Sequence, residues 1–315
     1  MNNTNIASEF ILSCLKEIEQ KELIGVIFIV IYIITLFGNI TVIVIVVMDQ
    51  QLQRPMYLCI VVLSVIDLTC STSIVLKILA ILLFKNARIP YSMCVLQMFI
   101  LHQMEILEIF LLTLMAFDRY VAVTNPLRYA SIITNKTILI SIAILNVIGL
   151  TLVTLFQYFA ASFHFCSTNI LPYCFCDFTA MLRIACFQDD RYIIVSSTVS
   201  AVCIIFTFLL ILLSYFRIIQ VALKTAKADG RMKAVSTCFT HLLIVGLFYI
   251  PLFFSYVIPA SRQISSSTVT SSMIMVSTII PPLLNPLIYS LRNNEIKQSM
   301  QKIITRKALA GFTFN

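Results

Sequence analysis

His102, Glu105 and Glu108 follow one another at intervals of three residues within a long apolar segment. In a helix this spacing places all three side chains on one face, which drifts slowly around the axis. Two carboxylates and an imidazole in contact with lipid would be prohibitive, so this face is expected to point into the protein. We interpret His102 and Glu105 as the leading ligand contacts. A zinc or copper site is the alternative, but the pattern lacks a third strong ligand.

A further carboxylate, Asp67, lies in the middle of another apolar run. A carboxylate buried in this way must be protonated, paired or bound to a cation. Asn39 and Asn285 lie in two other apolar runs, and a buried amide also needs partners. A cluster that only fixes packing would explain these residues, but the cost of the buried acid favours a functional role.

An acid–base pair, Asp118 and Arg119, ends the apolar run that begins at Cys94. Charged heads at the end of a spanning helix can reach the interface with water. Adjacent opposite charges can neutralise each other or exchange partners when helix ends move, so the pair is a candidate switch. The simpler interpretation is an anchor at the membrane edge.

The composition identifies the class of protein. Of the 315 residues, 60% are hydrophobic and 11% are charged, whereas globular domains contain about 45–50% apolar and about 25% charged residues. This excess indicates a polytopic membrane protein. The net charge of +8 does not indicate nucleic acid, because no segment resembles a nucleic-acid-binding module.

Seven apolar runs are long enough for the ~20 residues that a spanning helix needs. The expected spans are 24–48, 56–83, 94–120, 137–160, 191–223, 233–258 and 269–291. Most of the 22 Lys and Arg residues fall on one side if the N-terminus lies outside, which predicts a cytoplasmic C-terminus. The domains are then an extracellular N-terminus (1–23), a seven-transmembrane domain (24–291) and a cytoplasmic amphipathic helix with its tail (292–315).

The tail is expected to form a short amphipathic helix. Ile296, Met300 and Ile303 fall at helical spacing, with Lys297 and Lys302 among the flanking bases. Such a helix lies at the interface beside anionic lipid. The predicted fold is therefore an all-α membrane protein, a seven-transmembrane helix bundle with a short C-terminal amphipathic helix.

The N-terminal segment has no basic region followed by an apolar region, so no cleavable signal peptide is expected. Asn2 begins a glycosylation sequon. Cys94 and the loop cysteines Cys166, Cys174, Cys176 and Cys186 are expected to form disulfides outside the membrane, in pairings that spacing alone leaves open.

Seven strings resemble signatures of odorant receptors, a branch of the rhodopsin-like G-protein-coupled receptors. They are PMY at 55–57 with LSVID at 63–67, MAFDRYVAV at 115–123 with PLRY at 126–129, and KAVSTCFTHL at 233–242 with PPLLNPLIYSLRN at 281–293 beyond it; SEFIL at 8–12 precedes them. The helix-six string is the most specific. The chain departs from the usual forms at Phe117, Val123, Thr124, Thr240 and Pro251.

The resemblance implies several pairings. It implies disulfides Cys94–Cys176 and Cys166–Cys186, with Cys174 and Cys14 left unassigned. Glu108 resembles the acid that faces the helix-two Asp, and we expect Asp67 and Glu108 to share a proton or a sodium ion with Asn39 and Asn285. No other cofactor is expected. Leu101 stands where amine receptors of the superfamily carry Asp, although Glu105, one turn deeper, can take a cation.

The resemblance also implies a function that is not enzymatic. An odorant is expected to bind among helices three, five, six and seven, near His102, Glu105, Ile106, Val199, Cys203, Tyr249, Phe253 and Thr278. A heterotrimeric G protein of the olfactory stimulatory type is expected to dock at the plasma membrane's inner face and raise cyclic AMP. The expected switch residues are Asp118, Arg119, Tyr120, Tyr215, Lys233, His241 and Tyr289.

Two other classes of protein remain as alternatives. A transporter or channel could use Asp67, Glu105 and Glu108 as an ion path, but it would usually show repeated halves or broken-helix pairs. A non-olfactory rhodopsin-like receptor would share the fold. The helix-six string favours the odorant branch over it.

Overall fold

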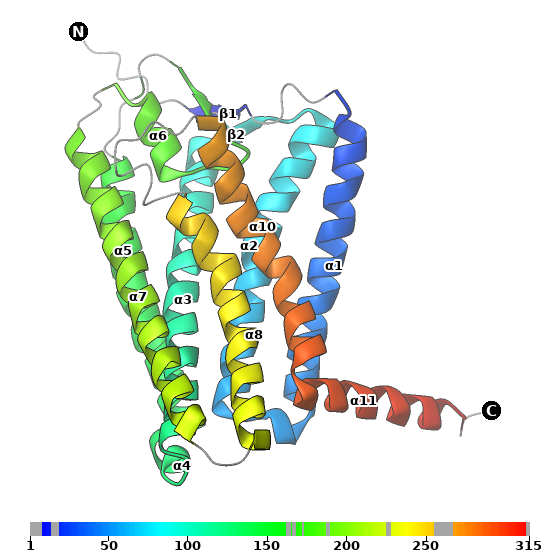
Figure 1. Ribbon diagram of the computed structural model, residues 1–315. Helices are drawn as coiled ribbons and strands as arrows, with labels where there is room; N and C mark the ends of the chain where they lie inside the picture. The colour runs from blue at the N-terminus through cyan, green and yellow to red at the C-terminus, as the bar shows by residue number, and fades with distance from the viewer. Residues whose placement is uncertain are drawn as a thin grey trace.

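The computed structural model describes residues 8–13, 19–161, 165, 168–171, 173–186, 190–224, 228–254 and 267–312. Within these ranges, seven long helices form one bundle (Figure 1). They are α1 (Lys21–Met48), α2 (Pro55–Phe84), α3 (Tyr91–Thr124), α5 (Asn135–Ala161), α7 (Asp190–Lys224), α8 (Ala228–Leu252) and α10 (Ser267–Arg292). Each corresponds to one span expected from the apolar runs.

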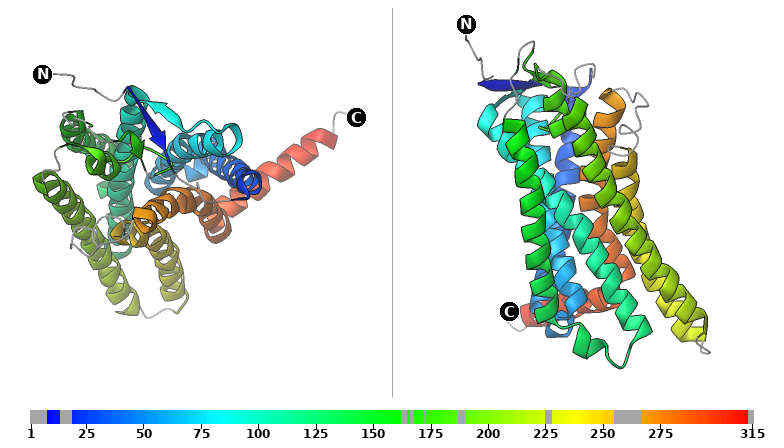
Figure 2. Two further views of the ribbon diagram at one scale, coloured as in Figure 1. Left: turned by 90° about the horizontal axis from the view of Figure 1, so that it is seen from above. Right: turned by 90° about the vertical axis from the view of Figure 1, so that its left-hand side faces the viewer.

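Shorter elements join and cap these helices. They are the 3₁₀ helix η1 (Gln50–Leu52), α4 (Tyr129–Ile132), α6 (Phe178–Ile184) and α11 (Asn294–Phe312), with strands β1 (Glu9–Leu12), β2 (Arg88–Pro90) and β3 (Ile170–Leu171). Helix α11 runs sideways away from the bundle (Figures 1 and 2). It is the amphipathic helix expected in the tail.

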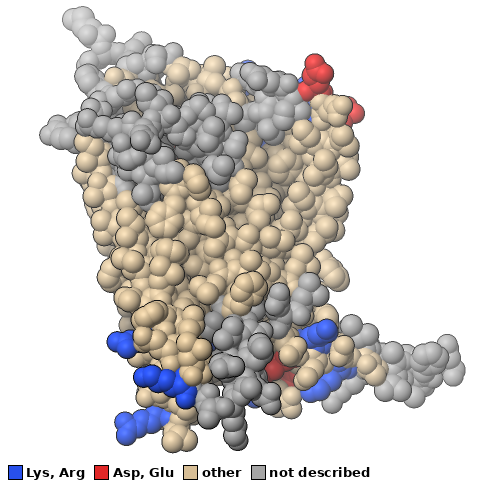
Figure 3. All heavy atoms as spheres, viewed as in Figure 1, with Lys and Arg blue, Asp and Glu red and all other residues tan. Residues whose placement is uncertain are grey.

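The outer surface of the bundle is apolar. Apolar windows of α1, α2, α5 and α7 have mean hydropathy between 2.2 and 2.7, long and apolar enough to cross a membrane. Only 17% of the α5 window is buried in the protein, against 56% of the α2 window. On the face in Figure 3, an uncharged belt separates the charged residues at the two ends, and Lys and Arg predominate at the end where α11 lies. An exposed apolar belt of this extent requires lipid.

Helix α3 positions the candidate site because it is packed against α2, α5 and α7. Its polar residues face inward: Gln103 Nε2 donates a hydrogen bond to Asn146 Oδ1 of α5 at 2.8 Å. A Cβ on Gly149 of α5 would lie 3.3 Å from the same Gln103 amide. The close approach of these two helices is fixed by that small residue and that hydrogen bond.

Helices α1 and α10 also meet at a glycine. A Cβ built on Gly38 would lie 2.9 Å from Pro286 Cγ. One residue on, Asn39 Nδ2 donates to the carbonyl oxygen of Pro282 at 2.9 Å. Proline frees a carbonyl inside its helix, and Asn39 satisfies that carbonyl only while the two helices remain close.

We expect Gly38→Ala to destabilise the protein by about 1–3 kcal/mol, because the rigid ring of Pro286 cannot move aside cheaply. Gly246→Ala is the matched control, since its nearest neighbour would be Ile250 Cδ1 at 3.9 Å. Thermal unfolding of the detergent-purified variants measures the effect. Equal melting temperatures for the two variants would contradict the close approach.

The N-terminal strand closes the end of the bundle opposite α11. β1 lies between β2 and β3, antiparallel to the first and parallel to the second, and Figure 2 shows it across the top of the bundle. Phe10 in this strand is fully buried. Its ring meets Phe165 edge-on, with centroids 5.1 Å apart, and lies 6.0 Å from Tyr91. The sheet joins the N-terminal segment to the connection between α2 and α3 and to that between α5 and α6.

We expect Phe10→Ala to lower the free energy of unfolding of this cap by about 3–5 kcal/mol through the cavity it leaves. Surface labelling of the epitope-tagged protein in expressing cells should fall accordingly. Phe37→Ala is the control, because the Phe37 side chain is 73% exposed on α1. If both variants reach the surface equally, the strand does not stabilise the folded protein.

Candidate functional site

Two cavities lie on either side of His102 and Glu105 in the half of the bundle nearer the sheet. The acidic cavity has about 550 Å³ of atom-free space, including space open to solvent, and is lined by Cys70, Leu101, His102, Glu105, Glu108, Phe175, Cys176, Asp177, Phe248, Ser277, Thr278 and Pro282. The apolar cavity has about 850 Å³, also including space open to solvent, and is lined by His102, Glu105, Ile106, Ile109, Leu152, Val153, Phe156, Gln157, Phe178, Val199, Ser200, Cys203, Ile204 and Leu252. His102 and Glu105 line both cavities.

Six of the eight ligand contacts expected from the sequence therefore line a cavity. The other two, Tyr249 and Phe253, pack beside them. Tyr249 is buried and donates a hydrogen bond from its hydroxyl to Thr207 Oγ1 at 2.9 Å. Phe253 packs edge-on against Phe208, with ring centroids 5.4 Å apart. Tyr249 and Phe253 therefore lie beside the cavity walls, because each follows a residue that lines a cavity: Phe248 lines the acidic cavity and Leu252 the apolar one.

Asp177 was not among the residues expected from the sequence. Its carboxylate Oδ2 lies 3.9 Å from His102 Nε2, and its Oδ1 accepts a hydrogen bond from the backbone N–H of Ala180 at the start of α6. His102 Nδ1 lies 2.8 Å from the carbonyl oxygen of Met98, so Nδ1 carries the donated hydrogen. The sequence did contain a signal for Asp177, because Asp177 follows Cys176. A disulfide from Cys176 to α3 must bring the residues next to Cys176 over the cavity.

That disulfide joins Cys94 at the start of α3 to Cys176 in the loop. Both sulfur-bearing residues are buried. Gln97, one turn into α3, accepts a hydrogen bond on Oε1 from the backbone N–H of Cys176 at 3.1 Å and donates from Nε2 to the carbonyl oxygen of Ser73 at 2.8 Å. The loop is thus fixed to α3 and α2 above the acidic cavity.

The remaining loop cysteines are also paired where they are described. Cys174 and Cys186 are each disulfide-bonded, so Cys174, which the resemblance left unassigned, has a partner. Cys166 and Cys14, like the Asn2 sequon, lie outside the described residues. The expected Cys166–Cys186 bond therefore stays a prediction.

The four polar-core residues lie deeper in the bundle, and all are buried. Asn285 Nδ2 donates to both carboxylate oxygens of Asp67, at 3.1 and 3.3 Å. Asn39 bonds instead to the carbonyl oxygens of Thr35 and Pro282. Glu108 is within electrostatic reach of Asp67 and Glu105, and its Oε1 has no hydrogen-bond partner among the described residues. Among those residues, no group of three or more His, Cys, Asp or Glu is arranged to hold a metal ion.

At the other end of α3, Asp118 is paired with a residue that the sequence analysis did not select. Its Oδ1 accepts a hydrogen bond from the hydroxyl of Tyr129 at 2.8 Å. Burial, and then the Asp118 carboxylate, raise the pKa of Tyr129, so the hydroxyl donates throughout the neutral range. Adjacent helix residues face different directions. Among the described ion pairs, Asp118–Arg119 does not occur.

The other expected switch residues surround this end of α3. Tyr215, His241 and Tyr289 are buried, and the rings of Tyr215 and His241 lie 6.3 Å apart. Tyr120 packs against Phe117. Lys233 lies within α8, but its side chain is outside the described part of the chain.

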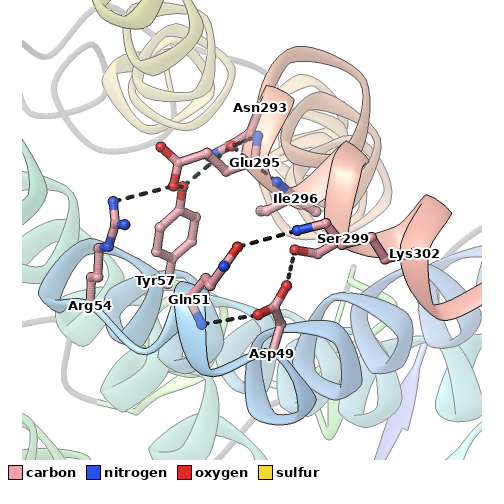
Figure 4. A network of polar contacts seen from close by, with 9 residues as sticks. All are labelled: Asp49, Gln51, Arg54, Tyr57, Asn293, Glu295, Ile296, Ser299 and Lys302. Carbon is pink, nitrogen blue, oxygen red and sulfur yellow. Dashed lines mark hydrogen bonds and ion pairs between the residues drawn. The ribbon is translucent and has the colours of Figure 1, made fainter.

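A polar network joins α11 to the segment between α1 and α2 (Figure 4). The hydroxyl of Tyr57 donates to Glu295 Oε2 at 2.8 Å, and Arg54 Nη1 lies 3.5 Å from the same oxygen. Asn293 Oδ1 accepts from the backbone N–H groups of Glu295 and Ile296 at 3.0 and 3.3 Å. Asn293 therefore caps the first turn of α11.

The second half of this network holds the middle of α11. Ser299 donates its hydroxyl hydrogen to Asp49 at the end of α1, and Lys302 Nζ donates to Gln51 Oε1 at 3.2 Å. Asp49 also accepts from the backbone N–H of Gln51 at 3.0 Å. These bonds fix the angle at which α11 leaves the bundle.

Comparison with known proteins agrees with this architecture. A family model described as olfactory receptor matches residues 28–307. The chain is 36% identical over 306 residues to olfactory receptor 1E1 of Pan troglodytes, covering 97% of each chain. It is 37% identical over 307 residues to olfactory receptor 1496 of Rattus norvegicus, covering 96% of this chain and 98% of that one.

The chain belongs to the olfactory receptor family. It is also 39% identical over 277 residues to olfactory receptor 10G6 of Homo sapiens, covering 88% of this chain and 82% of the relative. Membership in the family confirms the resemblance found in the sequence strings and the seven-helix fold. Olfactory receptors are odorant-sensing G-protein-coupled receptors, multi-pass proteins of the plasma membrane, and not enzymes.

Proposed function

We propose that a small-molecule odorant binds in the acidic and apolar cavities and that the occupied receptor activates a heterotrimeric G protein of the olfactory stimulatory type, raising cyclic AMP. The observation that carries this proposal is the position of His102 and Glu105 between two cavities beneath a loop held by Cys94–Cys176. A rigid loop above a partly apolar cavity with a few polar groups has the properties of a small-molecule site.

The proposed orientation places the sheet and the N-terminus (1–23) outside, the bundle (24–291) in the membrane and the tail (292–315) inside. The bases at the α11 end support it, since cytoplasmic segments carry an excess of Lys and Arg (Figure 3). The disulfides at the opposite end support it too, because such bonds persist in oxidising compartments. In this orientation α11 rests on the inner leaflet, with Lys297 and Lys302 beside anionic lipid headgroups.

The proposed mechanism is a shift of population. The odorant binds the active arrangement more tightly and moves the equilibrium by that difference in affinity. Helices α8 and α10 move at Pro251 and Pro286, where a proline interrupts each helix. Asp67, Glu108, Asn39 and Asn285 hold a proton or a sodium ion that stabilises the resting arrangement. Arg119 then turns to the G protein, and Tyr215 and Tyr289 stabilise the open inner face.

The experiment that tests this proposal is cyclic AMP production in cells that express the receptor with an olfactory stimulatory G protein. Pools of soluble and volatile odorants should include an agonist, with half-maximal effect at a reproducible concentration. Parallel current recordings test the channel alternative. Odorant-driven current that persists without any G protein would overturn the proposal in favour of an ion-conducting protein.

A further inference from the structure

Two phenyl rings from different segments of the chain line the apolar cavity. Phe156 belongs to α5, and Phe178 is the first residue of α6. Their ring centroids lie 6.0 Å apart and the ring planes meet at 65°, which is an edge-to-face arrangement. We call these two residues the aromatic pair. The ligand contacts expected from the sequence lay on the third, fifth, sixth and seventh spanning helices, whereas the aromatic pair adds the fourth spanning helix, α5, and the start of α6 to the site.

Phe178 is held in place by the residues beside it. Cys176, two positions earlier, is bonded to Cys94 of α3. Asp177, one position earlier, accepts a hydrogen bond on Oδ1 from the backbone N–H of Ala180 at 3.2 Å. The Phe178 side chain is buried. A buried ring that is anchored in this way offers a ligand a fixed surface, and a fixed surface lowers the entropic cost of binding.

Polar groups of the same cavity lie close to the aromatic pair. His102 and Glu105 line the apolar cavity together with both rings. Asp177, the residue before Phe178, has its Oδ2 atom 3.9 Å from His102 Nε2, and consecutive Cα atoms are about 3.8 Å apart. A ligand ring in contact with Phe178 is therefore near His102, so only a short spacer is needed to join that ring to a hydrogen-bonding group.

We propose that this receptor recognises aromatic compounds that carry a hydrogen-bonding group on a short spacer, with the ligand ring against the aromatic pair and the polar group at His102 and Glu105. This inference rests on the proposed function, because it names the ligand class of the same site. Contact between aromatic rings stabilises a complex beyond the area that it buries, whereas a saturated ring contributes buried area alone. A carboxylate can accept several hydrogen bonds on its two oxygens, so Glu105 can accept one from a ligand in addition to its contacts within the protein.

The test compares phenyl alcohols with cyclohexyl alcohols that have the same number of carbon atoms, with spacers of increasing length between ring and hydroxyl. Binding is measured directly on the full receptor in membranes. Cys203 lines the apolar cavity and is a free, half-buried thiol, so a ligand in this cavity should slow its alkylation by N-ethylmaleimide. Mass spectrometry of the peptide that contains Cys203 measures the rate. Cyclic AMP is measured in parallel.

We expect phenyl alcohols with short spacers to protect Cys203 at concentrations about 2- to 10-fold lower than their cyclohexyl counterparts. Phe178→Leu and Phe156→Leu should each remove most of that preference, because leucine keeps the wall apolar but has no ring. Phe206→Leu is the matched control and should leave the preference unchanged. Phe206 lies on α7, is 60% exposed and lines neither cavity.

Cyclohexyl alcohols that protect Cys203 as well as phenyl alcohols, or a phenyl preference that survives in both Leu variants, would overturn this proposal. Protection by neither series would overturn it too. If Phe178→Leu fails to fold, Phe156→Leu decides the test, because the Phe156 side chain is only half-buried. Failure of the proposed function looks different: phenyl alcohols would protect Cys203 selectively without any cyclic AMP response. A cyclic AMP response to other odorants, without any phenyl preference, would leave the proposed function intact and exclude the aromatic class.

Discussion

Arg119→Ala is expected to reduce odorant-evoked cyclic AMP to the level of cells without receptor, while surface expression remains near that of the unchanged protein. Arg119 is partly buried at the α11 end of α3, and its Nε has no hydrogen-bond partner among the described residues. Asp118 Oδ1 already accepts a hydrogen bond from the hydroxyl of Tyr129. Removal of the guanidinium therefore takes away no ion pair on which the described fold depends, but it removes the planar donor set available to a docking protein.

The measurement is a full odorant concentration series at matched surface level. Arg128→Ala is the control variant, because Arg128 is exposed in the loop that follows the same helix and changes charge equally. A normal cyclic AMP response in Arg119→Ala at normal surface expression would contradict the proposed role of Arg119 as a switch residue. An equal loss of odorant-evoked cyclic AMP in both variants would show that the effect comes from the overall positive charge of this surface and not from Arg119 itself.

Cys94→Ser is expected to abolish the correctly folded receptor at the cell surface. The bond from Cys94 to Cys176 closes a loop with a sequence separation of 82 residues. Loss of a native disulfide typically costs about 2–5 kcal/mol. It would also release Asp177 from the position where it faces His102. Odorant response and surface labelling should fall together.

The double variant Cys94→Ser/Cys176→Ser should be no worse than either single variant, since all three lose the same bond. Cys70→Ser is the matched control, because Cys70 is a buried free thiol that lines the acidic cavity. Additive losses in the double variant would show that the two cysteines act separately.

The helices were predictable because lipid imposes a strict requirement. A spanning helix must be apolar over ~20 residues, and seven runs met that length. Inward-facing residues were predictable for the same reason: charged groups such as Glu105 and Glu108 cannot face lipid. Six of the eight expected ligand contacts lie at a cavity, and those that share a helix, such as Val199 and Cys203, are three or four positions apart and so lie on one face.

The elements that the sequence did not predict depend on distant partners. β1 has four residues, and its contacts with Arg88 and Asn169 lie 79 and 160 positions away. Asp177 reaches His102 only through the loop that the disulfide holds. The bonds from Asp49, Gln51 and Tyr57 to α11 span more than 230 positions, and no local pattern marks them.

The most direct test of the central claim is nucleotide exchange by a purified olfactory stimulatory G protein in nanodiscs that contain this receptor. With an active odorant, the account predicts faster exchange for the unchanged receptor and for Arg128→Ala, and basal exchange for Arg119→Ala. An odorant that binds the receptor, as direct binding measurements show, but leaves exchange at the basal rate would contradict it, because binding would then not be coupled to a G protein.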